Sequence, residues 1–211
     1  PLPNQRAEGR NKFSTFWHRD GSGKLVVNTF WNSDAAPNYY EQPWHKGGMA
    51  TPPGKCAWAA AYKDDASAEP RTNCAMAIQK NGVPYGVSTS DVTLGFFNDL
   101  VACKEADLNA EMLIVEADGK IISNSSRISG PIVLKHISEL AATSPFAAQV
   151  KAGLDHRDQP LQRVEFDNKG EASTFFMRPI EGTPWFLATA LPTRLITAQR
   201  DDVLSTLSLL Q

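Results

Sequence analysis

Two runs of small and aromatic residues each end on a carboxylate. The first run ends at Asp64 and the second at Asp91. If both runs are strands, every second side chain of a run shares one face. These faces hold Trp58, Ala60, Tyr62 and Asp64 in the first run, and Tyr85, Val87, Thr89 and Asp91 in the second. Two such faces predict the walls of a pocket for a small polar molecule, and no feature of them points to covalent chemistry.

An aromatic segment, residues 38–45, precedes both runs. Its Trp44 follows a proline, so the indole could stack on a ligand or on a cation at the mouth of such a pocket. Plain packing is the alternative for Trp44. The neighbouring His45 could add pH sensitivity near its unperturbed pKa of about 6.5, or it could simply be exposed.

The other pocket candidates also have structural roles open to them. Asp91 stands between an expected strand and an expected helix, where a carboxylate commonly caps the first turn. Asp64 could be a solvated loop residue beside Asp65. Tyr62 could pack in the core or donate a hydrogen bond to a ligand. Ligand contact and these structural roles therefore both stay open.

These residues, taken in order, resemble the double Cache (dCache) sensor domain of bacterial transmembrane receptors. The motifs that carry the likeness are Pro43-Trp44-His45, Tyr62-Lys63-Asp64, and Asn81-Gly82 through Gly86-Val87 to Asp91. A second set, at residues 113–122 and 182–192, resembles the smaller module of that family. The resemblance covers roughly residues 13–200.

The resemblance implies an α+β fold of two PAS-like modules, each an antiparallel sheet flanked by helices. Residues 1–102 would form the membrane-distal module with the ligand pocket, and residues 103–192 the membrane-proximal module. Residues 193–211 would form a helix that leads to a membrane span. The family's long N-terminal helix, which usually forms a homodimer, is missing, because residues 1–12 are polar and interrupted by proline and glycine. Because Pro1-Leu2-Pro3 is not a natural start, we take the chain as an excised fragment of a membrane-embedded protein.

The resemblance also suggests what the pocket binds. The predicted ligand-binding residues are Gln42, Trp44, His45, Trp58, Tyr62, Asp64 and Asp91. Family members that bind free amino acids carry an arginine two residues before the tryptophan, where it grips the α-carboxylate. Gln42 is neutral at that position, whereas Asp64 and Asp91 remain, and Asp91 matches the position that binds the ligand's amino group. We therefore expect an amine or a quaternary ammonium ligand. An amino acid held by Arg71 or Lys46, a purine, or a small carboxylate stays open as an alternative.

Composition excludes several other functions. The 211-residue chain has a net charge of −2 and no basic stripe, so no nucleic-acid partner is expected. No signal peptide opens the chain, and no apolar run approaches the roughly 18–20 residues that cross a bilayer. The four histidines and three cysteines lack the spacing of metal ligands, so neither a metal nor another cofactor is expected.

Two of the three cysteines could form a disulfide bond. Cys56 and Cys74 flank a polar loop, and a bond between them would stabilise the fold by on the order of 3 kcal/mol in the chain-entropy model. A periplasmic location would permit that bond; two unpaired thiols on neighbouring strands are the alternative. Cys103 is expected to be buried on the apolar side of a helix.

Periodicity and turn signals predict the elements themselves. Strands are expected at residues 13–18, 24–30, 57–62, 73–79, 83–90, 112–116, 120–123, 163–166, 172–178 and 185–190. Helices are expected at residues 38–45, 93–105, within 130–153, and from 193 to 210. Residues 123–127 could line a minor pocket, although a solvated loop is the favoured interpretation.

Three classes of function stay open. The leading one is the periplasmic sensor domain of a receptor, most commonly a chemoreceptor, although kinases, cyclic-dinucleotide enzymes and phosphatases use such sensors too. A free solute-binding protein is disfavoured because βαβ patterning is absent. An enzyme is not expected: residues 86–90 lack the last glycine of a Gly-x-Ser-x-Gly nucleophile motif, and no catalytic set stands out.

Overall fold

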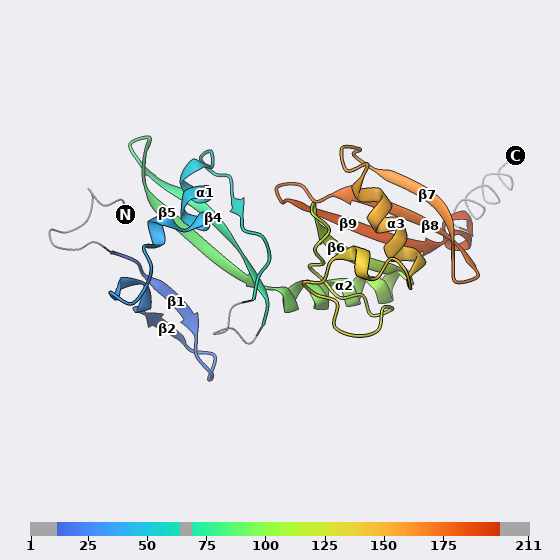
Figure 1. Cartoon of the computed structure of the whole chain (residues 1–211), viewed down its shortest axis with the longest axis horizontal. Coiled ribbons are helices and arrows are strands. Elements are labelled where there is room, and N and C mark those ends of the chain that lie inside the picture. Colours follow the sequence, from blue (N-terminus) through green and yellow to red (C-terminus); the bar gives the residue numbers. More distant parts are fainter. Residues whose placement is uncertain (1–11, 64–68, 199–211) are drawn as a thin grey trace, which may run out of the picture. The chain divides into compact units, whose positions relative to one another are not determined.

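The computed structural model describes residues 12–63 and 69–198 of the chain (Figure 1). The strands are β1 (Phe16–Arg19), β2 (Leu25–Asn28), β3 (Ala57–Trp58), β4 (Arg71–Lys80), β5 (Val83–Thr93), β6 (Glu111–Glu116), β7 (Gln162–Asn168), β8 (Glu171–Pro179) and β9 (Trp185–Pro192). The α-helices are α1 (Pro43–Ala50), α2 (Leu94–Leu108) and α3 (Pro145–Leu154), and the short 3-10 helices are η2 (Phe30–Asn32), η3 (Tyr39–Glu41) and η4 (Ile137–Glu139). The predicted α+β class is confirmed.

The chain divides into two compact units. Unit 1 holds the described residues up to Ala59 together with Asn73–Asp91. Unit 2 holds the described residues of Ala60–Thr72 and those from Val92 onward. The boundary that we predicted at residue 102 lies inside α2, within unit 2.

Unit 1 begins with the antiparallel hairpin of β1 and β2, as predicted. Its turn is organised by Asp20, whose carboxylate accepts hydrogen bonds from Ser22 N, Ser22 Oγ and Lys24 N at 2.9, 2.6 and 3.1 Å. These bonds, the one from the Ser22 hydroxyl foremost, lower the pKa of the Asp20 carboxyl.

The second sheet of the chain has the strand order β3-β4-β5, and α1 packs on it. Asn81 and Gly82 both have positive φ, 53° and 76°, which suits the two-residue turn predicted between β4 and β5. Helix α1 begins at Pro43. The predicted helix at 38–45 is therefore wrong in its bounds, because proline fits the first helical position instead of stopping a helix there.

Close approach of α1 to the sheet depends on Gly48. A Cβ added at Gly48 would lie 2.7 Å from Val87 Cγ1 and 3.0 Å from Ala75 Cβ. Only a residue without a side chain can pack here, so α1 lies on the sheet face that carries Ala75 and Val87.

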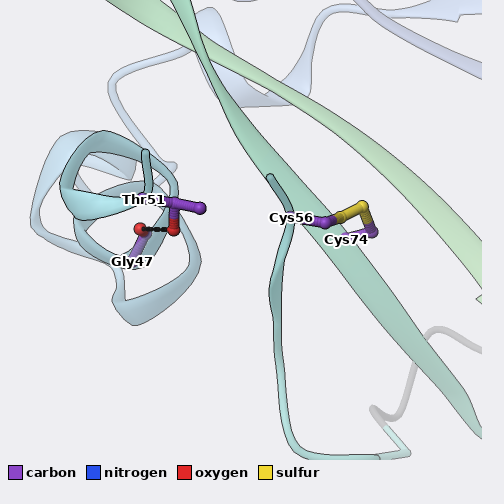
Figure 2. The surroundings of a disulfide bond; sticks show 4 residues. All are labelled: Gly47, Thr51, Cys56 and Cys74. Atoms are coloured by element: carbon purple, nitrogen blue, oxygen red, sulfur yellow. Dashed lines mark hydrogen bonds between the residues drawn. A yellow bond between two sulfur atoms is a disulfide. The ribbon is translucent and has the colours of Figure 1, made fainter. Parts of the chain in front are cut away.

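A disulfide bond joins Cys56 to Cys74 in this part of the chain (Figure 2). The two Cα atoms are 5.5 Å apart, within the range that disulfides require. Cys56 immediately precedes β3 and Cys74 lies in β4, so the bond fastens a two-residue strand to a long one.

Unit 2 is built on an antiparallel sheet with the strand order β6-β9-β8-β7. Helix α3 packs on one face, over a core that includes Leu113, Phe146 and Phe175. Every residue of β6 is buried, because α2 packs against the same strand and Phe97 meets Trp185 edge to face at 5.1 Å. Lys120 and Ile121 form isolated bridges where we predicted a strand at residues 120–123.

Helix α2 buries an apolar stripe that does not include Cys103. Leu94, Phe97, Val101 and Glu105 are buried. Cys103 is exposed, and so is Leu100 at 44 % of its surface. The predicted burial of Cys103 is therefore wrong, because the spacing of Glu105 from Val101 turns the buried stripe away from Cys103.

Glu105 is a buried carboxylate that organises the loop after β6. It is 1 % exposed, and it accepts hydrogen bonds from Met112 N at 2.7 Å, Ser126 N at 2.8 Å, and the hydroxyls of Ser125 and Ser126. Ser123 is buried as well, and its Oγ accepts from Ile114 N at 2.9 Å. Residues 123–127 are therefore an anchored structural segment, not the solvated loop that we favoured.

We expect Glu105→Ala to destabilise unit 2 by about 3 kcal/mol, because several buried donors would lose their charged acceptor. Urea unfolding followed by tryptophan fluorescence measures the change. Glu181→Ala, at an exposed position, is the matched control and should change stability by less than about 0.5 kcal/mol. Equal stability of the two variants would show that the Glu105 bonds contribute little.

The cysteines make a second prediction. In the native protein a maleimide should label one thiol per chain, at the exposed Cys103, because Cys56 and Cys74 are bonded. Peptide mapping without a reductant locates the label. Cys103→Ser should abolish labelling of the native chain, and two or more labels on the untreated protein would contradict the disulfide.

Candidate functional site

Trp44 lies in the first turn of α1, at the centre of an aromatic cluster. Its ring stacks on Tyr39 with a centroid separation of 6.3 Å and an interplanar angle of 22°, and it meets Trp31 edge to face at 6.3 Å. Trp44 itself is only half-buried. One part of the Trp44 indole therefore packs in the cluster, and another part is exposed. Packing and ligand stacking both stay open as roles for this residue.

Tyr39 is the residue of this cluster that the sequence analysis missed. It is 3 % exposed, and its hydroxyl accepts from Phe13 N and donates to Phe13 O, both at 3.0 Å. His45 lies 5.7 Å from the Tyr39 ring and is 4 % exposed. The alternative of an exposed His45 is therefore wrong. A tyrosine five residues before the tryptophan was the available signal for the cluster.

Gln42 is the N-cap of α1, with extended backbone and no capping bond from its side chain. Its carbonyl accepts from His45 N and Lys46 N, each at 3.1 Å. Lys46 is an exposed helical residue, not the loop residue that we assumed. The start of α1 therefore presents a neutral amide at position 42 and a cation one turn later.

Trp58 lies on the face of the sheet opposite α1. It pairs with Cys74, whereas its neighbour Ala57 pairs with Ala75, which faces α1. Because successive strand residues point to opposite faces, Trp58 and Ala75 point in opposite directions. Trp58 and Val87, which we predicted to line two walls of one pocket, therefore lie on opposite faces of the sheet.

Asp91 lies inside β5 and is exposed. The N-cap of α2 is Thr93, so the capping role that we considered for Asp91 is wrong. Alternation from Val87, which faces α1, places Asp91 on the same face of the strand. Its carboxylate is thus on the α1 side of the sheet in unit 1.

Tyr62 belongs to unit 2, and Asp64 lies outside the described residues. Tyr62 is 36 % exposed, so the core alternative for its ring is wrong. It is bridged to Arg71 by two backbone bonds, Tyr62 N to Arg71 O at 2.9 Å and Arg71 N to Tyr62 O at 2.8 Å. Arg71 is therefore a strand residue, and side chains directly opposite each other leave the same face of an antiparallel pair.

The structure brings together only some of the predicted site residues. Trp44 and His45 share one cluster, and Asp91 lies on the sheet face that α1 covers. Trp58 points away from that face. Tyr62 is placed with Arg71, in the other unit. That Trp44, His45 and Asp91 line one pocket of unit 1 stays a prediction.

In residues 12–63 and 69–198, no group of three or more His, Cys, Asp or Glu side chains could hold a metal ion. No helix of this part of the chain is long and apolar enough to cross a membrane.

One family model matches the N-terminal part of the chain. Residues 2–99 match the family model described as the methyl-accepting chemotaxis protein-like, first PDC sensor domain. No curated protein sequence matches the chain.

Solved structures extend the likeness over most of the chain. The ligand-binding domain of the amino acid chemoreceptor PctC of Pseudomonas aeruginosa, solved with GABA, is 19 % identical with a TM-score of 0.54; the match covers 86 % of this chain and 75 % of that one. The ligand-binding domain of the Pseudomonas fluorescens chemoreceptor CtaA, solved with L-isoleucine, is 18 % identical with a TM-score of 0.55, over 86 % and 70 %.

A third similar structure comes from another class of receptor. It is the extracellular domain of mmHK1S-Z3, a protein assigned as a histidine kinase, which is 16 % identical with a TM-score of 0.59 over 89 % of this chain and 64 % of that one. At these identities the likeness shows the fold. Residues 2–99 are therefore similar to the first PDC sensor domain of the methyl-accepting chemotaxis protein-like family, in a chain that has the Cache-type fold of chemoreceptor ligand-binding domains.

Proposed function

We propose that this chain is the extracytoplasmic sensor domain of a membrane-embedded bacterial receptor, a chemoreceptor, and that it binds its ligand in the periplasm. The match of residues 2–99 to a chemotaxis sensor family is the observation that carries the proposal. In this proposal the N-terminal half, residues 1–102, binds the ligand, and residues 103–192 form the membrane-proximal module. Residues 193–211 lead to the membrane, and the receptor is a homodimer.

The ligand that we propose carries an amine or quaternary ammonium group. Asp91 offers an exposed carboxylate on the α1 side of the sheet, and Trp44 offers a partly exposed indole, a ring type that attracts cations. Gln42 supplies no charge for a carboxylate. The related PctC domain was solved with GABA, which also carries an ammonium group.

One observation favours a second candidate, an amino acid. Arg71 lies directly opposite Tyr62, so its guanidinium leaves the strand beside the phenol ring. A guanidinium can hold a carboxylate by two parallel hydrogen bonds. In this second proposal Arg71 replaces the arginine that is absent at position 42.

A thermal-shift panel separates these candidates. It should contain tetramethylammonium, short alkylamines, γ-aminobutyrate, protein amino acids, purines and small organic acids. We expect ammonium compounds to raise the melting temperature in a concentration-dependent way, because a ligand that binds only the native state stabilises it by mass action. Stabilisation by organic acids alone would contradict the ammonium proposal, and stabilisation by amino acids alone would favour the second candidate.

Substitutions then locate the site. Trp44→Ala and Asp91→Ala should each raise the Kd of the best ligand at least about tenfold, roughly 1.4 kcal/mol, as measured by calorimetry. Trp44→Phe keeps an aromatic ring in the cluster and separates lost binding from lost packing. Trp17→Ala and Asp158→Ala, at exposed positions elsewhere, are the matched controls. Unchanged affinity in both site variants would remove Trp44 and Asp91 from the site.

A further inference from the structure

The ion pair of Glu116 and Lys120 binds both the N–H and the C=O group of Ala61, the residue before Tyr62. Ala61 N donates to Glu116 Oε1 at 2.8 Å, and Lys120 Nζ donates to Ala61 O at 3.2 Å. The two side chains also bridge each other, with Lys120 Nζ 3.4 Å from Glu116 Oε2. Ala61 is 4 % exposed and Glu116 is 5 % exposed, so the bond between them is buried, whereas the Lys120 side chain is 29 % exposed.

Burial makes this arrangement specific. A buried carboxylate is costly unless hydrogen bonds and a counter-charge compensate for its lost hydration, and here both come from one amide and one ammonium. The Ala61 backbone, the Glu116 carboxylate and the Lys120 ammonium are therefore hydrogen-bond partners of one another. Removing either side chain leaves a polar group of Ala61 without that partner. We call Ala61, Glu116 and Lys120 the Ala61 clamp.

The turn that carries the clamp is itself rigid. Glu116 N donates to Lys120 O at 2.8 Å, and Lys120 N donates to Asp118 Oδ1 at 3.0 Å. His136 Nε2 lies 2.7 Å from Asp118 O. Gly119, with a φ of 94°, leaves the space that the imidazole fills, since a Cβ there would lie 2.6 Å from His136 Nε2. The clamp thus has a fixed base.

Tyr62 is held on its other side by β4. Its backbone exchanges two hydrogen bonds with Arg71, and the next residue towards the N-terminus is the clamped Ala61. The backbone at Tyr62 is therefore held by Arg71 and, through Ala61, by Glu116 and Lys120, which all belong to unit 2.

The same clamp adjoins the strand that leads to the C-terminal helical segment. Glu116 pairs with Trp185 at the start of β9. β9 ends at Pro192, and residues 193–198 are helical. Thr193 Oγ1 lies 2.9 Å from Thr174 Oγ1 of β8, so the first helical residue is tied to the sheet. One strand, β9, thus connects the pairing partner of Glu116 to this helix.

We propose that Glu116 and Lys120 are positioning residues for ligand binding. They fix the segment that presents Tyr62 beside Arg71 and tie that segment to β6 and β9, all within unit 2. The inference rests on the proposed sensor function for its ligand, whereas the clamp itself can be tested without one.

The first arm measures residue-resolved amide hydrogen exchange by NMR in the ligand-free chain. Lys120→Met and Glu116→Leu should each speed exchange at Ala61 and Tyr62 by about tenfold or more. Amides of Leu113 and Ala188, both buried in the core, should keep their protection. Glu116→Gln retains an acceptor for Ala61 N and should have a smaller effect at Ala61. Lys151→Met and Glu181→Gln, both at exposed positions, are the matched controls.

The second arm measures the binding of tetramethylammonium and of γ-aminobutyrate by calorimetry in the same variants. Lys120→Met should raise the Kd of whichever probe binds, while the controls leave it unchanged. Unaltered exchange at Ala61 and Tyr62 would overturn the clamp, and faster exchange with unaltered Kd would overturn its positioning role. If neither probe binds the unmodified chain, the proposed ligand class fails and the exchange arm alone decides the clamp.

Discussion

Strand β6 and the carboxylates beside it are the constraint on which unit 2 depends. Every residue of β6 is buried. Polar groups of the segments that pack beside β6 must therefore find hydrogen-bond partners within the protein. Glu105 does this for the segment at 123–127 and Glu116 does it for the segment at 60–63. Both carboxylates accept backbone amide hydrogens. Glu105 and Glu116 therefore anchor two loops of unit 2 by hydrogen bonds, as the apolar core anchors the sheet.

Unit 1 is organised by aromatic packing and one close helix contact. Gly48 lets α1 approach Ala75 and Val87, and Tyr39 ties the Trp44 cluster to Phe13. The result is a partly exposed indole held on a rigid support, with the carboxylate of Asp91 on the same side of the sheet. That combination of a preorganised ring and an accessible negative charge is the physical basis for proposing an ammonium ligand.

Sequence patterns predicted the elements well where a local signal was strong. The turns at Asp20 and at Asn81-Gly82 and the strands β7 to β9 follow from turn residues and alternation. Contacts between residues far apart in the sequence could not be predicted in this way. Nothing local indicates that Glu105 reaches Ser126, or that Glu116 reaches Ala61, because those contacts depend on tertiary packing. Trp58 and Cys103 were misplaced for a related reason: one position of strand register or helix phase changes which face a side chain occupies.

An NMR titration that follows the indole N–H signals tests the central claim most directly. The chain has five tryptophans, and Trp44 is the one in the proposed site, whereas Trp17 lies exposed on the β1–β2 hairpin. During titration with an ammonium compound, the account predicts that the Trp44 indole signal moves to saturation while the Trp17 signal stays unchanged. Saturable shifts at other indoles with a stationary Trp44 signal would contradict it.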